Sequence, residues 1–143
     1  EKEEEKILNA IRMAFKIWTE QSMLNFVEIK KQDAADIRIS FQKSKHRDLD
    51  PYDLDGTTLA HAFQPGEGIH GDAHFKENVE WDFDVLADEK AALGKTSFFS
   101  VALHELGHSL GMFELWFHKK QYFRNLFMYA CASSCTHPFL RFF

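Results

Sequence analysis

The sequence has little cysteine and no excess of positive charge. Its two cysteines, Cys131 and Cys135, lie close together near the end, so cysteine gives no disulfide framework for the rest of the chain and does not indicate its compartment. A formal net charge of -5 argues against nucleic acid and anionic membranes as partners. No apolar run approaches the roughly 20 residues that span a bilayer. The acidic residues 1–6 do not form the apolar segment of a signal peptide.

The 143 residues, 45% of them hydrophobic, are enough for one domain with a buried core. Periodicity predicts helices over 3–20 and 97–110, with Thr96 as a candidate N-cap, and alternation predicts strands between them. This order indicates an α+β domain built in layers. The expected strands are 26–29, 37–41, 58–63 and 69–75; a polar loop covers 43–57 and a helical turn 85–93.

The second predicted helix carries a metal-binding pattern. His104 and His108 are four residues apart, so both imidazoles can face one zinc ion. Glu105 follows the first histidine, where a carboxylate can take a proton from a zinc-bound water. Gly111 permits a sharp turn, after which a third ligand is expected at position 114. The residue there is Glu114 instead of a histidine.

The third zinc ligand is left open by the sequence. Carboxylates ligate zinc, so Glu114 is one candidate, and His118 lies one helical turn further on. A site with no third protein ligand is the remaining alternative, and it would bind zinc weakly. Cys131, Cys135 and His137 are better interpreted as incidental residues than as a metal cluster.

A second constellation lies upstream and consists of His46, Asp48, His61 and His74. Three imidazoles and one carboxylate complete the tetrahedral set of a structural zinc site. His61 and His74 alternate with apolar neighbours on their predicted strands, so they can face a common side. Each one alone would be interpreted as a surface histidine, whereas the spaced set indicates zinc.

Several carboxylates suggest calcium. Asp36 and Asp72, with backbone oxygens from the turn at 66–70, would supply the oxygen ligands that this ion takes. Asp53 and the carbonyl groups after it suggest a further site. The alternative is that these acidic residues are solvated loop residues.

Residues 7–111 resemble the catalytic domain of matrixins, the matrix metalloproteinases. Other zinc proteases share the long histidine motif but lack the upstream set of His46, Asp48, His61 and His74, so this set makes the resemblance specific to matrixins. The segments that carry it are Ala35–Phe41, Leu59–Gly66, Gly71–Phe75 and Val101–Gly111.

The resemblance implies a zincin-like fold: three helices and a twisted, mostly parallel five-stranded sheet whose first strand would precede residue 1. It implies a family domain over 1–112 and a tail of different character over 113–143. His104 and His108 match catalytic zinc ligands, Glu105 the general base, and His46, Asp48, His61 and His74 the structural zinc ligands. Asp36, Asp72, the carbonyls of Gly68 and His70, and Asp53 match calcium ligands. Leu59 and Ala60 match the strand that pairs with an extended substrate.

Two functions follow as expectations. The first is a secreted zinc endopeptidase that hydrolyses extracellular matrix proteins and is recognised by protein inhibitors. The alternative is an inactive, metal-stabilised domain, or a fragment, that binds protein segments without cleaving them. The replacement of the third histidine by Glu114 keeps both open.

Overall fold

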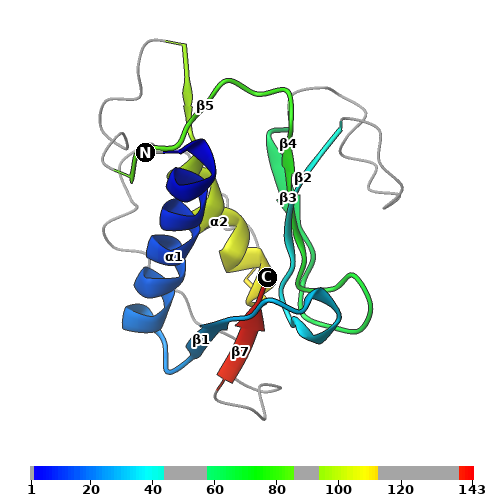
Figure 1. Cartoon of the computed structure of the whole chain (residues 1–143). Coiled ribbons are helices and arrows are strands. Elements are labelled where there is room, and N and C mark those ends of the chain that lie inside the picture. The colour runs from blue at the N-terminus through cyan, green and yellow to red at the C-terminus, as the bar shows by residue number, and fades with distance from the viewer. Residues whose placement is uncertain (1, 44–57, 86–93, 113–138) are drawn as a thin grey trace.

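The computed structural model describes residues 2–43, 58–85, 94–112 and 139–143. Figure 1 shows the two long helices side by side, with strands along one side of them and at both their upper and their lower ends. Neither helix in this part of the chain combines the length and apolar character that crossing a bilayer requires. The elements in chain order are α1 (Glu3–Gln21), β1 (Asn25–Glu28), the 3-10 helix η1 (Gln32–Ala34), β2 (Ile39–Gln42), β3 (Ala60–Ala62), β4 (Ala73–Lys76), β5 (Trp81–Asp82), β6 (Thr96–Ser97), α2 (Phe98–Ser109) and β7 (Phe139–Phe142).

The described strands form three groups. β4 lies between β2, to which it is parallel, and β3, to which it is antiparallel. β1 pairs in parallel with β7, and β5 with β6. An isolated bridge between Ile37 and Phe142 links the β1–β7 pair to the residues that lead into β2. The predicted α+β class is confirmed, whereas the single five-stranded sheet is seen here as groups of three, two and two strands.

The helix predictions differ from the structure by one residue at each changed boundary. α1 ends at Gln21 instead of residue 20, and α2 spans 98–109 instead of 97–110. The N-cap is Ser97, not Thr96, because the Ser97 side chain accepts a hydrogen bond from the Ser100 amide; both residues also form β6.

Three strands were not predicted. β5 and β6 have two residues each, too few for an alternating pattern, and β7 lies in an aromatic stretch without alternation. The predicted strands 58–63 and 69–75 are seen as the shorter β3 and β4. The polar loop expected at 43–57 and the turn expected at 85–93 lie almost wholly outside the described residues.

One apolar core joins both helices to the strands. The buried faces of α1 and α2 are apolar and include several alanines, whose small side chains let the helices approach closely. Burying these side chains fixes the position of α2. The core members include Ala10, Ile11, Ala14 and Phe15 of α1, Phe98, Ala102 and Leu106 of α2, and Ile37, Ala73, Phe75 and Phe142.

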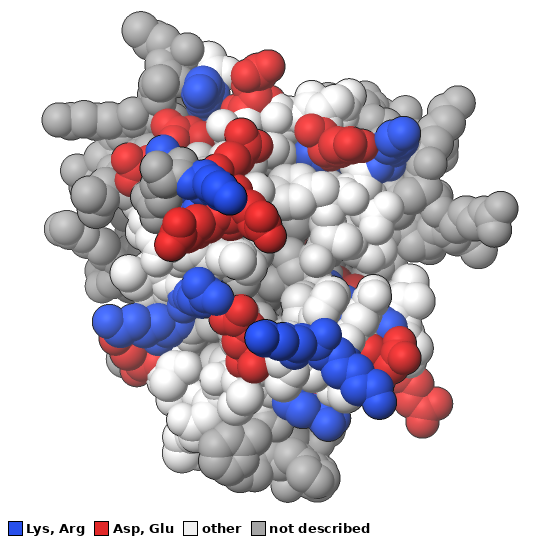
Figure 2. All heavy atoms as spheres, in the orientation of Figure 1, with Lys and Arg blue, Asp and Glu red and all other residues white. Residues whose placement is uncertain are grey.

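Charged side chains surround this core without gathering into one field. Figure 2 shows acidic and basic groups interspersed over the described part of the face seen in Figure 1. Mixed charge of this kind gives no broad basic footprint on that face for a polyanion.

Candidate metal centre

α2 presents the predicted zinc ligands from a fixed position. Phe98, Ala102 and Leu106 bury one face of the helix almost completely, so the opposite face is directed outward. His104 on that face is exposed, and His108, one turn later, is half-buried. Glu105 lies next to His104 but is buried, with 6% of its surface exposed. The helix therefore carries a buried carboxylate next to an exposed imidazole, with a second, half-buried imidazole one turn later.

The two imidazoles converge through the same ring atom. His104 Nε2 and His108 Nε2 lie 3.1 Å apart, and the ring planes are almost perpendicular, at 86°. Two nitrogen ligands of one tetrahedral zinc, each about 2.0–2.1 Å from the metal, lie about 3.3 Å apart. The pair therefore fits a zinc ion with very little adjustment.

The turn after α2 holds the ring of His108. Gly111 has a φ of 93°, the Gly111 amide donates to His108 O, and the Met112 amide donates to Gly107 O. These bonds form a Schellman C-cap, which glycine permits. The turn brings Met112 O to 2.7 Å from His108 Nδ1. Because a carbonyl only accepts, Nδ1 carries the proton and Nε2 is left to bind a metal.

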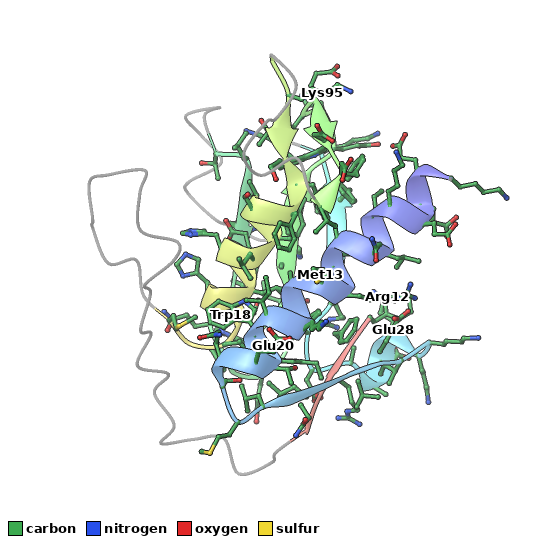
Figure 3. The ribbon with its side chains drawn as sticks, turned by 90° about the vertical axis from the view of Figure 1, so that its left-hand side faces the viewer. Arg12, Met13, Trp18, Glu20, Glu28 and Lys95 are labelled. Atoms are coloured by element: carbon green, nitrogen blue, oxygen red, sulfur yellow. The ribbon has the colours of Figure 1, made fainter. Side chains whose placement is uncertain are left out.

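α1 supports the same helix from its other side. The indole Nε1 of Trp18 donates to the carbonyl of Leu103, 3.1 Å away, and Leu103 directly precedes His104. Figure 3 shows Trp18 on α1, where the two helices lie against each other. This bond ties the middle of α2 to α1 close to the first zinc ligand.

A second pair of imidazoles lies on the sheet. His61 of β3 and His74 of β4 are directly opposite in the antiparallel register, and their ring centroids are 5.1 Å apart. Phe63 contacts both rings edge-on. Strand pairing thus brings together two of the four predicted ligands of the structural zinc.

β3 is paired on one side only within the described residues. The Lys76 amide donates to Leu59 O and the Phe63 amide to Asp72 O, so Leu59 and Phe63 turn their backbone groups toward β4. Because backbone direction alternates along a strand, Ala60 and Ala62 turn theirs toward the other edge. Of the two predicted substrate residues, Ala60 has the backbone orientation needed to pair with an added strand, while the Leu59 carbonyl already bonds β4.

The remaining predicted zinc ligands fall outside the described residues. These are His46 and Asp48 for the structural site, and Glu114 and His118 for the α2 site; Asp53, predicted for calcium, also lies outside. Within 2–43, 58–85, 94–112 and 139–143, no three histidine, cysteine, aspartate or glutamate side chains gather into one metal-binding group. Each site is therefore represented there by two histidines.

The predicted calcium ligands are engaged by arginines. Arg38 Nε lies 3.0 and 2.9 Å from the two carboxylate oxygens of Asp72, and the same guanidinium bonds the carbonyl of Gly68. Asp72 is 6% exposed, so its charge needs such a partner. In this arrangement the Asp72 carboxylate and the Gly68 carbonyl do not fit a calcium ion unless Arg38 moves away.

Asp36, the other predicted carboxylate, binds Arg141 instead. Arg141 Nε and Nη2 donate to its two oxygens at 3.0 and 2.9 Å, and hydrogen bonding to Asp36 is the main cause that raises the pKa of Arg141.

His70 lies in the turn before β4, where its Nδ1 is 3.1 Å from Gln64 O. Gly71, at φ 87°, is needed because a Cβ there would lie 2.7 Å from Asp36 O.

Three residues of these sites were not predicted from the sequence. Arg38 could have been found, because it lies two residues after Asp36 and competes with a cation for the same acidic groups. Met112 acts through its carbonyl, which no side-chain pattern reveals. Arg141 meets Asp36 across 105 positions of sequence, and nothing local connects them.

Comparisons with known proteins agree on one family. The matrixin family model matches residues 1–129 and so continues past Gly111. The chain is 47% identical over 105 residues to stromelysin-1 of Mus musculus, covering 73% of this chain and 20% of that protein. It is 45% identical over 107 residues to matrix metalloproteinase-2 of Drosophila melanogaster, covering 75% and 14%. With interstitial collagenase of Sus scrofa the identity is 44% over 108 residues, covering 76% and 21%.

The chain belongs to the matrixin family. Matrixins are zinc-dependent metalloendopeptidases that typically also bind calcium, and the predicted family is confirmed. This matrixin chain spans about a fifth or less of the length of the three relatives.

Proposed function

We propose that this matrixin chain is a zinc-dependent endopeptidase domain that hydrolyses peptide bonds of extracellular, matrix-type proteins. The observation that carries the proposal is the 3.1 Å separation of His104 Nε2 and His108 Nε2, beside a buried Glu105. Family membership supports an extracellular location and recognition by protein inhibitors. The family domain is proposed over 1–112, with 113–143 as its tail.

In this proposal His104 and His108 hold the catalytic zinc and Glu114 completes the set. Zinc, when bound, supplies a Lewis acid that polarises the scissile carbonyl and lowers the pKa of water to about 7. Glu105 takes the proton from the attacking water and passes it to the leaving amine. His108 keeps its tautomer because Met112 O accepts its Nδ1 proton. Trp18 holds the backbone next to His104.

The substrate is proposed to pair along β3. Ala60 and Ala62 turn their backbone groups away from β4, and β3 lies against α2, which carries the histidines. An extended peptide that adds a strand here would pass close to them. Leu59, whose side chain is 38% exposed, would contact that peptide through its side chain, because its carbonyl bonds Lys76.

A structural zinc is proposed at His61 and His74, completed by His46 and Asp48. The cross-strand pairing of the two described histidines supports it, because both rings are held before any metal arrives. Calcium at Asp36, Asp72, Gly68 and His70, and at Asp53, is the weaker part of the proposal because Arg38 and Arg141 bind the two described carboxylates.

The second candidate function is a metal-stabilised domain that binds protein segments without cleaving them. It is favoured by one observation: the sequence has Glu114 at the position where the third zinc histidine is expected. Such a domain would keep the structural zinc and the β3 edge.

Glu105→Gln separates the two candidates because it removes the base and keeps the side-chain volume. If the chain is an enzyme, hydrolysis of a generic fluorogenic peptide should fall by about 100-fold or more, the usual range for a general base. The zinc content should stay at two per chain. Glu4→Gln, in the exposed first turn of α1, is the matched control and should keep full activity. One zinc per chain and no hydrolysis by the unaltered protein would refute the enzyme and support the binding domain.

A further inference from the structure

β7 is hydrogen-bonded on both of its sides. On one side it pairs with β1 in parallel, from Asn25 opposite Phe139 to Glu28 opposite Phe142. The Ile29 amide extends this pairing by donating to Phe142 O at 2.9 Å. In Figure 1 this last strand lies beside β1, below the end of α2.

On its other side β7 pairs with the residues that lead into β2. The Ile37 amide donates to Arg141 O at 3.0 Å, the Phe143 amide to Ile37 O at 3.0 Å, and the Ile39 amide to Phe143 O at 2.9 Å. The bridge between Ile37 and Phe142 is parallel. Residues 139–143 therefore fill a groove between two segments that are neighbours in sequence but are not hydrogen-bonded to each other there.

Side chains make this placement specific to sequence. Arg141 binds the Asp36 carboxylate with both arms of its guanidinium, and the Arg141 backbone amide donates to Asp36 Oδ2 at 2.7 Å. Phe142 is 6% exposed and its ring stacks on Phe15 of α1, with centroids 4.1 Å apart. Backbone pairing alone would accept any extended segment, whereas these contacts require an arginine followed by an aromatic residue.

We propose that the groove between β1 and the residues leading into β2 is a strand-binding site whose occupant is the chain's own segment 139–143. With it in place, β1, β7, β2, β4 and β3 follow one another as five neighbouring strands, of which only β3 is antiparallel. This pairing fixes the C-terminal residues to the sheet, and it does not depend on whether the chain is catalytically active. A free peptide with the sequence of residues 138–143 competes for the same groove.

The test uses the full chain and Arg141→Ala. Hydrogen exchange of the Ile37, Ile39 and Phe143 amides should speed up by about threefold, the effect expected from losing an ion pair whose two side chains are largely exposed. Amides in the middle of α2 should exchange at their original rate. Arg12→Ala is the matched control, because Arg12 and Glu28 form a similar pair of exposed side chains (Figure 3). It should leave those three amides protected.

A labelled peptide of residues 138–143 gives the second measurement. It should bind the Arg141→Ala chain about threefold more tightly than the unaltered chain, whose groove is filled by its own residues 139–143. The same peptide with glutamate in place of its arginine should not bind. Equal, fast exchange of the three amides in both chains, or equal binding of both peptides, would overturn the proposal.

If Arg141→Ala unfolds the whole chain, a charge exchange decides the matter. The double variant Asp36→Arg with Arg141→Asp reverses the ion pair and should recover most of the melting temperature. Failure of the double variant to recover any of it would also overturn the proposal.

Discussion

The predicted metal ligands fall into two regions that differ in what holds them. On α2 and on the β3–β4 pair, imidazoles face imidazoles, with Nε2 atoms 3.1 Å apart in one case and ring centroids 5.1 Å apart in the other. In the acidic region, Asp72 and Asp36 instead face arginines, at 2.9 Å in both pairs.

The difference follows from charge. Neutral imidazoles can be held close together at small electrostatic cost, so helix spacing and strand register preorganise them for a metal. A carboxylate that is largely buried, as Asp72 is, requires a positive charge beside it. In this chain Arg38 supplies that charge. Removing zinc should therefore destabilise the histidine regions, whereas removing calcium should change the stability of the acidic region little.

The largest effect is expected from His74→Ala. The substitution removes one ligand of the proposed structural zinc, so affinity at that site should fall by at least about 100-fold and one zinc per chain should be lost. Because a structural zinc contributes directly to folding, the melting temperature should fall too, and it should respond less to a chelator than that of the unaltered chain.

His70→Ala is the matched control for His74→Ala. His70 is exposed in the turn before β4 and contacts a backbone carbonyl, so its removal should leave zinc content unchanged. Retention of the original zinc content and chelator response by His74→Ala would show that the β3–β4 histidines do not bind structural zinc.

A smaller effect should come from Arg38→Met. Without the guanidinium, the buried Asp72 carboxylate keeps the hydrogen bond from the backbone amide of residue 38 but loses its ion-pair partner, which should cost about 1–3 kcal/mol in the free energy of unfolding. Calcium should then replace the missing charge: at about 100 times its dissociation constant, a ligand of the folded state restores about 2.7 kcal/mol. The unaltered chain should gain much less stability from calcium, because Arg38 competes for Asp72. Thermal unfolding with and without calcium measures both.

Arg12→Met controls for the loss of an arginine from an ion pair. Arg12 bonds Glu28 and joins α1 to β1, whereas Asp72 is bonded by Arg38, so this variant should not gain any response to calcium. If calcium stabilised the unaltered chain as strongly as Arg38→Met, the proposed competition between Arg38 and calcium would be wrong.

The sequence predicted best what depends on local spacing. The predicted bounds of the histidine helix differ from those of α2 by one residue at each end. The prediction succeeds because the apolar face, the glycine turn and the four-residue spacing all lie within one segment. His61 and His74 could be expected to meet because alternation places each on a face of its own strand. In both cases one periodic rule was enough.

Contacts between distant segments could not be predicted in this way. β7 pairs with β1 and with the residues before β2 across more than a hundred positions, and its four residues, Phe-Leu-Arg-Phe, show no clear alternation. Arg38 lies within the predicted strand 37–41, but only the fold shows that its side chain reaches both Asp72 and Gly68. Pairing partners in a sheet depend on topology, and composition alone does not determine it.

The smallest effect tests how little an ion pair contributes when both members are exposed. Hydrogen bonding from Arg12 lowers the pKa of Glu28, so the pair stabilises the fold above the ordinary glutamate range and this contribution is lost as the pH falls below about 4. The side chains are 49% and 43% exposed, so solvent screening limits the contribution to less than about 1 kcal/mol. Chemical denaturation of the unaltered chain and of Glu28→Gln should show a small difference at neutral pH that closes in acid and in high salt. If the difference in unfolding free energy between the two chains stayed constant from neutral to acid pH, Glu28 would act through packing and not through its charge. The contrast between this exposed pair and the more buried pair of Arg38 and Asp72 would then not rest on charge.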